Sequence, residues 1–125
     1  MLCKKLTNSG FETINFHAGF RLKSKTPVLV DFWAEWCGPC HALAPDVEAT
    51  AERYRDGGQV VKVNVDDSPS LAQRYRIPAI PTLILFQDGV EKERIVGVAS
   101  QEQISETIER YIRADFATAS FRRKA

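Results

Sequence analysis

The run from Val28 to Ala34 constrains the fold of this chain more than any other segment. It is nearly continuous in apolar residues and rich in β-branched ones, a pattern typical of a strand buried on both faces of a parallel sheet. From Gly38 to about Arg55 the apolar spacing changes to that of one helix face, with Pro45 inside it predicting a kink. A buried strand that leads directly into a helix predicts an α/β chain.

Further elements alternate along the chain. We predict strands at 12–16, 60–65, 82–86 and 90–96. We predict helices at about 15–24, at 69–75 with Ser68 as the N-cap residue, and from residue 100 onward. The Asp88-Gly89 dipeptide indicates a hairpin, and Ser100 with Gln103 forms a capping box. The order β-α-β-α-β-α-β-β-α predicts a mixed central sheet covered by helices on both faces.

Length and charge limit the domain organisation and the partners. A chain of 125 residues is one domain, which we place at residues 11–116, between an N-terminal extension (1–10) and a basic tail (117–125) that is a frayed helix end or mobile. With 17 Lys and Arg against 16 Asp and Glu, the net charge of +1 offers no electrostatic case for nucleic acid or an anionic membrane. No signal peptide and no apolar run of about 20 residues is visible, which favours a cytoplasmic protein.

The motif Cys37-Gly38-Pro39-Cys40-His41 carries the chemistry, and it fits two signatures. C-x-x-C beside a strand and a helix indicates a dithiol redox centre, whereas C-x-x-C-H indicates covalent attachment of haem. Unpaired N–H groups and the positive end of the dipole at a helix N-terminus favour a thiolate, so we expect Cys37 to be the nucleophile. We expect Cys40, one turn further in, to be more buried and to act as the resolving thiol.

Two neighbouring features favour the redox interpretation. Asp31 interrupts an apolar strand, and burial should raise its pKa towards the range useful for accepting a proton from Cys40. Lys62, on the next strand, is its expected buried partner. Ile80-Pro81 directly precedes a strand, where a cis bond would leave the Ile80 backbone free to pair with an extended substrate.

The chain resembles the thioredoxin family in the order, spacing and identity of its motifs, from about residue 12 to 112. The residues that carry the resemblance are Val30 to Cys40, Pro45, Lys62 to Asp66, Ile80 to Thr82 and Gly97. The resemblance implies the thioredoxin fold and a protein-disulfide reductase that works by reversible dithiol–disulfide exchange through a mixed disulfide.

The resemblance also implies roles and partners. Cys37 would attack, Cys40 would resolve, and Asp31 with Lys62 would accept the proton. A flat apolar rim would dock partners, with Pro81 cis; its residues would be Trp36, Gly38, Pro39, Ile80, Pro81 and Gly97. We expect a monomer without cofactor or metal, which reduces disulfide-containing proteins and is itself reduced by thioredoxin reductase, an NADPH-dependent flavoprotein.

Three features depart from the family pattern. His41 stands where Lys or Arg is more common; an imidazole changes charge near neutral pH, so His41 could join Gly38 and Pro39 in tuning the redox centre. The N-terminal extension contains a third cysteine, Cys3, which we interpret as a free thiol, with a regulatory or intermolecular disulfide as the alternative. The C-terminus runs past the usual last helix.

Three other functions remain as alternatives. Haem attachment would need His41 and a second axial ligand, for which His17 and Met1 are the only His and Met residues left. A zinc site would combine Cys37, Cys40 and His41 with Cys3 or His17, although adjacent helix residues point in different directions. A scaffold role in a larger assembly would add to the redox chemistry.

Overall fold

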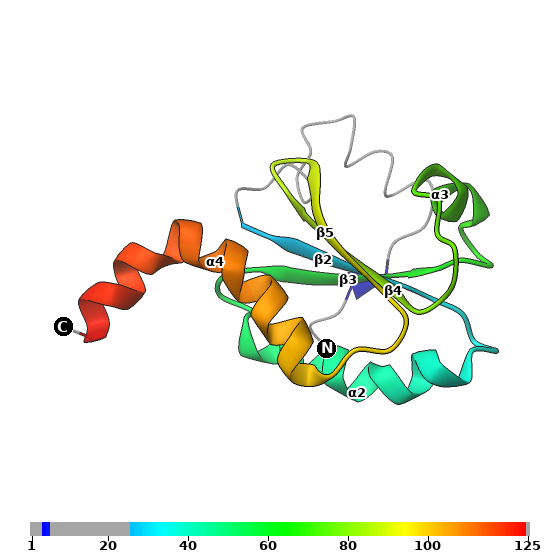
Figure 1. Cartoon of the computed structure of the whole chain (residues 1–125), viewed down its shortest axis with the longest axis horizontal. Helices are drawn as coiled ribbons and strands as arrows, with labels where there is room; N and C mark the ends of the chain where they lie inside the picture. The colour runs from blue at the N-terminus through cyan, green and yellow to red at the C-terminus, as the bar shows by residue number, and fades with distance from the viewer. Residues whose placement is uncertain (1–3, 6–25, 125) are drawn as a thin grey trace.

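The fold is a mixed five-stranded sheet with helices on both faces (Figure 1). The structure is a computed structural model that describes residues 4–5 and 26–124, with side chains from 26 to 112. The strands are β1 (Lys4–Lys5), β2 (Val28–Trp33), β3 (Gln59–Asn64), β4 (Thr82–Gln87) and β5 (Val90–Val96), in the spatial order β1-β3-β2-β4-β5. β1 and β2 run parallel to β3, while β4 runs antiparallel to both β2 and β5.

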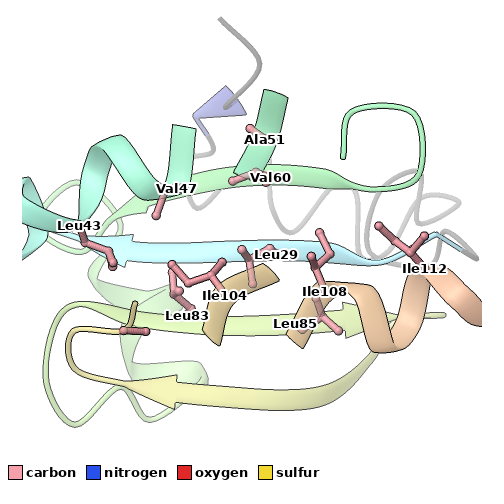
Figure 2. Close-up of a cluster of buried hydrophobic side chains, with 11 residues drawn as sticks. Leu29, Leu43, Val47, Ala51, Val60, Leu83, Leu85, Ile104, Ile108 and Ile112 are labelled. Carbon is pink, nitrogen blue, oxygen red and sulfur yellow. The ribbon is translucent and has the colours of Figure 1, made fainter. Parts of the chain in front are cut away.

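The helices divide between the two faces of the sheet. Figure 1 shows α2 (Gly38–Arg53) and α4 (Gln101–Lys124) on one side and α3 (Pro69–Arg74) on the other. The larger core lies beneath α2 and α4 and includes Leu29, Leu43, Val47, Val60, Leu83, Leu85, Ile104 and Ile108 (Figure 2). The second core lies beneath α3 and includes Val28, Val30, Phe32, Val61, Val63, Leu71, Ile84 and Phe86. Alternate residues of β2 therefore serve opposite cores, as the continuous apolar run predicts.

Most predicted elements are confirmed within one or two residues. β5 has the predicted bounds, and the predicted capping box of α4 is present: Ser100 N donates to Gln103 Oε1 (3.3 Å) and Gln103 N donates to Ser100 Oγ (3.1 Å). Ser68 is the N-cap residue of α3 as expected, but its Oγ makes no capping bond and is buried without a hydrogen-bond partner. α2 continues through Pro45.

Regular structure is present at both ends of the chain, outside the predicted domain of residues 11–116. Lys4 and Lys5 belong to the segment expected to be an extension, yet they pair with Val61 and Lys62 as an edge strand. Two lysines carry no apolar periodicity, so sequence patterns cannot reveal such a strand. At the other end, α4 continues to Lys124 and projects beyond the sheet (Figure 1), because neither Gly nor Pro interrupts it. The strand and helix predicted at 12–24 lie outside the described residues.

Candidate active site

The two cysteines of the motif form a disulfide at the start of α2, just after the end of β2. Cys37 is the N-cap residue of α2, with φ −92° and ψ 105°, and Pro39 lies in the first helical turn, where its missing N–H costs nothing. Cys40 N donates to Cys37 Sγ (3.2 Å), and Cys37 N donates to Ala34 O (3.2 Å). The helix start therefore presents backbone N–H groups and the positive dipole end to Cys37 sulfur.

Burial does not distinguish the two cysteines. Each is 4 % exposed, so the expectation that Cys40 is the more buried of the two is wrong for this disulfide form. The cause is packing around the linked pair: Trp33, Val65 and Ile80 all pack against the cluster of Ala34, Cys37 and Cys40. What differs between the cysteines is backbone position, since only Cys37 occupies the N-cap.

Asp31 is a buried carboxyl group on the face of the sheet that α2 covers. It is 3 % exposed and lies two residues after Leu29, which packs in the core beneath α2. Its Oδ1 atom has no hydrogen-bond partner, and burial raises its pKa from 3.8 to about 6, opposed by the charge of Lys62. A solvent-facing Asp31 is thereby excluded.

Lys62 lies beside Asp31, as predicted, but it is half-buried instead of buried, and it also contacts an aromatic ring. The two residues are direct partners in the register of β2 and β3. Lys62 Nζ lies 4.5 Å from the ring centroid of Trp33, an arrangement that favours the ammonium charge. The sequence patterns do not indicate a role for Trp33 at this site, because the contacts of its ring depend on strand register.

His41 is exposed on the first turn of α2, as expected. Its Nε2 atom lies 2.7 Å from the carbonyl oxygen of Glu35, which can only accept, so Nε2 carries a hydrogen in this contact. Its ring meets that of Trp33 edge-on at 6.0 Å. His41 therefore links the turn before Cys37 to the helix after it.

The predicted rim residues differ in exposure, and one of them is buried. Trp36 is 70 % exposed, and Gly38 and Pro39 are exposed beside it. Ile80 is half-buried and packs against the cysteines. Pro81 is buried and therefore adds little exposed apolar surface. Its carbonyl accepts from Gly97 N (2.8 Å) at the start of the β4–β5 ladder.

The bond between Ile80 and Pro81 is cis, as predicted. Nearby hydrogen bonds use the carbonyl of Ala79, which accepts from Thr82 Oγ1 (2.6 Å), and that of Pro81. Within the described part of the chain, the backbone of Ile80 has no hydrogen-bond partner. The donor and acceptor of Ile80 are therefore available beside the disulfide.

Two features near the disulfide were not predicted from the sequence. Asp66 Oδ2 accepts from Trp36 Nε1 (2.7 Å), which fixes the indole across thirty residues of sequence. Val98 is 62 % exposed beside Gly97, whose φ of +94° suits glycine. No local pattern signals either feature, because both depend on how the loops meet in space.

Comparison with known proteins decides the family. A model of the thioredoxin family matches residues 5–110. The chain is 46 % identical over 91 residues to Thioredoxin 1 of Synechococcus elongatus, covering 73 % of this chain and 85 % of that protein. It is also 46 % identical over 91 residues to the chloroplastic M-type thioredoxin of Chlamydomonas reinhardtii, covering 73 % and 65 % of the two chains.

The chain belongs to the thioredoxin family. With its paired cysteines joined at the start of α2, this thioredoxin-family protein is a protein-disulfide oxidoreductase. Among the residues described, no three His, Cys, Asp or Glu side chains gather as a metal-ligand set; Cys3 and His17 lie outside that part of the chain. None of the described helices has the length and apolarity to cross a membrane.

Proposed function

We propose that Cys37 is the attacking thiol and Cys40 the resolving thiol in the reduction of protein disulfides. Cys37 thiolate attacks one substrate sulfur, forming a mixed disulfide and releasing the other sulfur as a thiolate that takes up a proton. Cys40 then attacks Cys37 sulfur, so that the substrate leaves as a dithiol and the protein holds the Cys37–Cys40 disulfide. The observation that carries this assignment is the bond from Cys40 N to Cys37 Sγ at the helix N-terminus, since both would stabilise a Cys37 thiolate.

Asp31 is the proton acceptor for Cys40 in this proposal. Cys40 must lose its proton before it can attack the mixed disulfide. A general base works best with a pKa near the working pH, and burial brings the pKa of Asp31 to about 6. Its unpartnered Oδ1 leaves an acceptor site on the side that α2 covers, and the facing Lys62 steadies the carboxylate.

The substrate in this proposal is an extended protein segment that carries a disulfide. Trp36, Gly38, Pro39, Ile80 and Gly97 form the docking surface around the cysteines, and a Cβ on Gly38 would meet nothing within 4 Å, so the approach there is open. The free backbone of Ile80 would pair with the substrate chain as an added strand does.

Thioredoxin reductase is the electron donor we propose, acting on a monomeric protein in the cytoplasm. The alternative location is a plastid, because relatives such as the M-type thioredoxin of Chlamydomonas reinhardtii are named chloroplastic. Imaging the full-length protein in its host would separate the two locations, and turnover with purified reductase and NADPH would test the donor.

The roles of the cysteines are tested by insulin reduction driven by dithiothreitol. We expect Cys37→Ser to abolish turnover, and Cys40→Ser to accumulate a mixed disulfide visible on non-reducing electrophoresis. Cys3→Ser is the matched control, because it removes a thiol that the mechanism does not use. Full turnover by Cys37→Ser would contradict the proposal.

A further inference from the structure

The loop 77–81 connects α3 to β4 and brings Ile80 to the disulfide. Ile77 packs in the core beneath α3, while Ile80 contacts both that core and the cysteine cluster. In the proposed function, on which this inference rests, Ile80 docks the substrate. The position of the loop therefore decides how well a protein substrate fits. Its two ends are held by Arg94 of β5 and by Gly97, the residue directly after β5.

Arg94 on β5 holds the beginning of this loop. Its Nη2 donates to Tyr75 O (2.8 Å) and its Nη1 donates to Arg76 O (3.2 Å), the two residues that follow α3. Carbonyls at a helix C-terminus lack hydrogen-bond partners within the helix. Here the Arg94 guanidinium donates to two such carbonyls. The Arg94 side chain is only 26 % exposed, so these bonds are partly shielded from water.

Glu91 fixes the Arg94 guanidinium in a two-point ion pair. Arg94 Nε donates to Glu91 Oε2 (2.9 Å), and Nη2 donates to Glu91 Oε1 (3.0 Å). Residues three apart on a regular strand point to opposite faces. The register shift between Leu85 and Phe86 removes this conflict: Glu91 pairs with Phe86 and Arg94 with Ile84, two residues of the core beneath α3.

Further contacts on both sides of the loop restrict the movement of Ile80. The Tyr75 ring packs against Phe86, with centroids 5.4 Å apart, and Arg76 turns the chain with a φ of 51°. At the far end of the loop, Gly97 N on the segment after β5 donates to Pro81 O. Only residues 77–80 lie between Arg76 and Pro81, so a shift at Arg76 should also displace Ile80.

We propose that Arg94 is a positioning residue for protein substrates. By binding the carbonyls of Tyr75 and Arg76, it holds the loop 77–81 in the position in which Ile80 contacts both the disulfide and the substrate chain. Arg94 touches no reacting atom. Its effect should therefore appear in substrate binding and leave the sulfur chemistry unchanged.

The test compares Arg94→Met with Arg110→Met. Arg110 makes a matched two-point pair with Glu93 on the same strand (2.9 and 2.7 Å), but it belongs to α4, on the opposite face of the sheet from α3. For Arg94→Met we expect KM for insulin to rise about five- to tenfold, with kcat, the reduction potential and the rate with a small aromatic disulfide unchanged. Arg110→Met should leave KM for insulin within about twofold of the parent.

Two further variants keep the proposal falsifiable. Arg94→Lys preserves charge but cannot reach Glu91 and both carbonyls together, so its KM should lie between those of the parent and Arg94→Met; this variant also serves if Arg94→Met does not fold. If Arg94→Lys and Arg94→Met fold but keep the parental KM, or raise KM no more than Arg110→Met does, the proposal is overturned.

A double-mutant cycle separates this inference from the proposed function. Ile80→Ala alone should raise KM for insulin, and adding Arg94→Met to it should raise KM by much less than Arg94→Met does alone. If Ile80→Ala has no effect on KM, the docking role in the proposed function fails. If Ile80→Ala raises KM and the two effects multiply independently, docking stands and the positioning role of Arg94 is wrong.

Discussion

Replacing Asp31 with asparagine should stabilise the folded protein above about pH 6. Asp31 is 3 % exposed, and burial raises its pKa from 3.8 to about 6, against the opposing charge of Lys62. At about 1.4 kcal/mol per pH unit, the difference between these two pKa values corresponds to about 3 kcal/mol of folding free energy lost when Asp31 is ionised.

The sign of the effect follows from proton binding. Folded Asp31 holds its proton more tightly than the unfolded chain does, so the free energy of unfolding falls as the pH rises from about 4 to about 6 and then levels off. The Asp31→Asn variant lacks this loss. Its free energy of unfolding should exceed that of the parent by about 3 kcal/mol near pH 8 and by far less near pH 3.

Guanidinium unfolding of the oxidised protein at both pH values measures this difference. Asp67→Asn is the control, since Asp67 is exposed and should change stability by less than about 0.5 kcal/mol at either pH. In the same Asp31→Asn preparation, insulin turnover should fall about a hundredfold or more as the general base is lost. Equal stabilisation at both pH values would refute the electrostatic reasoning, and unchanged turnover would refute the role of Asp31 as a base.

Three further predictions concern other parts of the molecule. Trp36→Ala should raise KM for insulin about tenfold, equivalent to about 1.4 kcal/mol, while a small aromatic disulfide reacts at the parental rate; equal losses with both substrates would contradict a docking role. His41→Lys should shift the reduction potential of the Cys37–Cys40 pair and the pH dependence of Cys37 alkylation, and if neither moves, His41 does not tune the site. Ser100→Ala removes the capping bond to Gln103 N and should lower the free energy of unfolding by about 1 kcal/mol in a denaturant titration, with insulin turnover as the measurement that should not change.

Local patterns predicted most of the sheet and the helices. The apolar run of β2, the Asp88-Gly89 turn and the capping box of α4 each depend on residues close together in sequence, and each is present. The β1 strand was missed because two lysines join the sheet through backbone bonds to β3, which leave no side-chain pattern. The end of α4 at Lys124 could not be predicted, because a helix without Gly or Pro has no local stop signal.

The sequence by itself determined the chemistry of this protein: two cysteines one helical turn apart at a helix start, and a carboxyl group in an apolar strand. Both follow from local periodicity, which the order of residues dictates. Tertiary structure alone decided how those groups are presented. The burial of both cysteines, the fixing of Trp36 by Asp66, and the anchoring of the loop 77–81 by Arg94 join residues far apart in sequence. Such contacts depend on strand register and on how the loops meet, and these arise only when the whole sheet is packed.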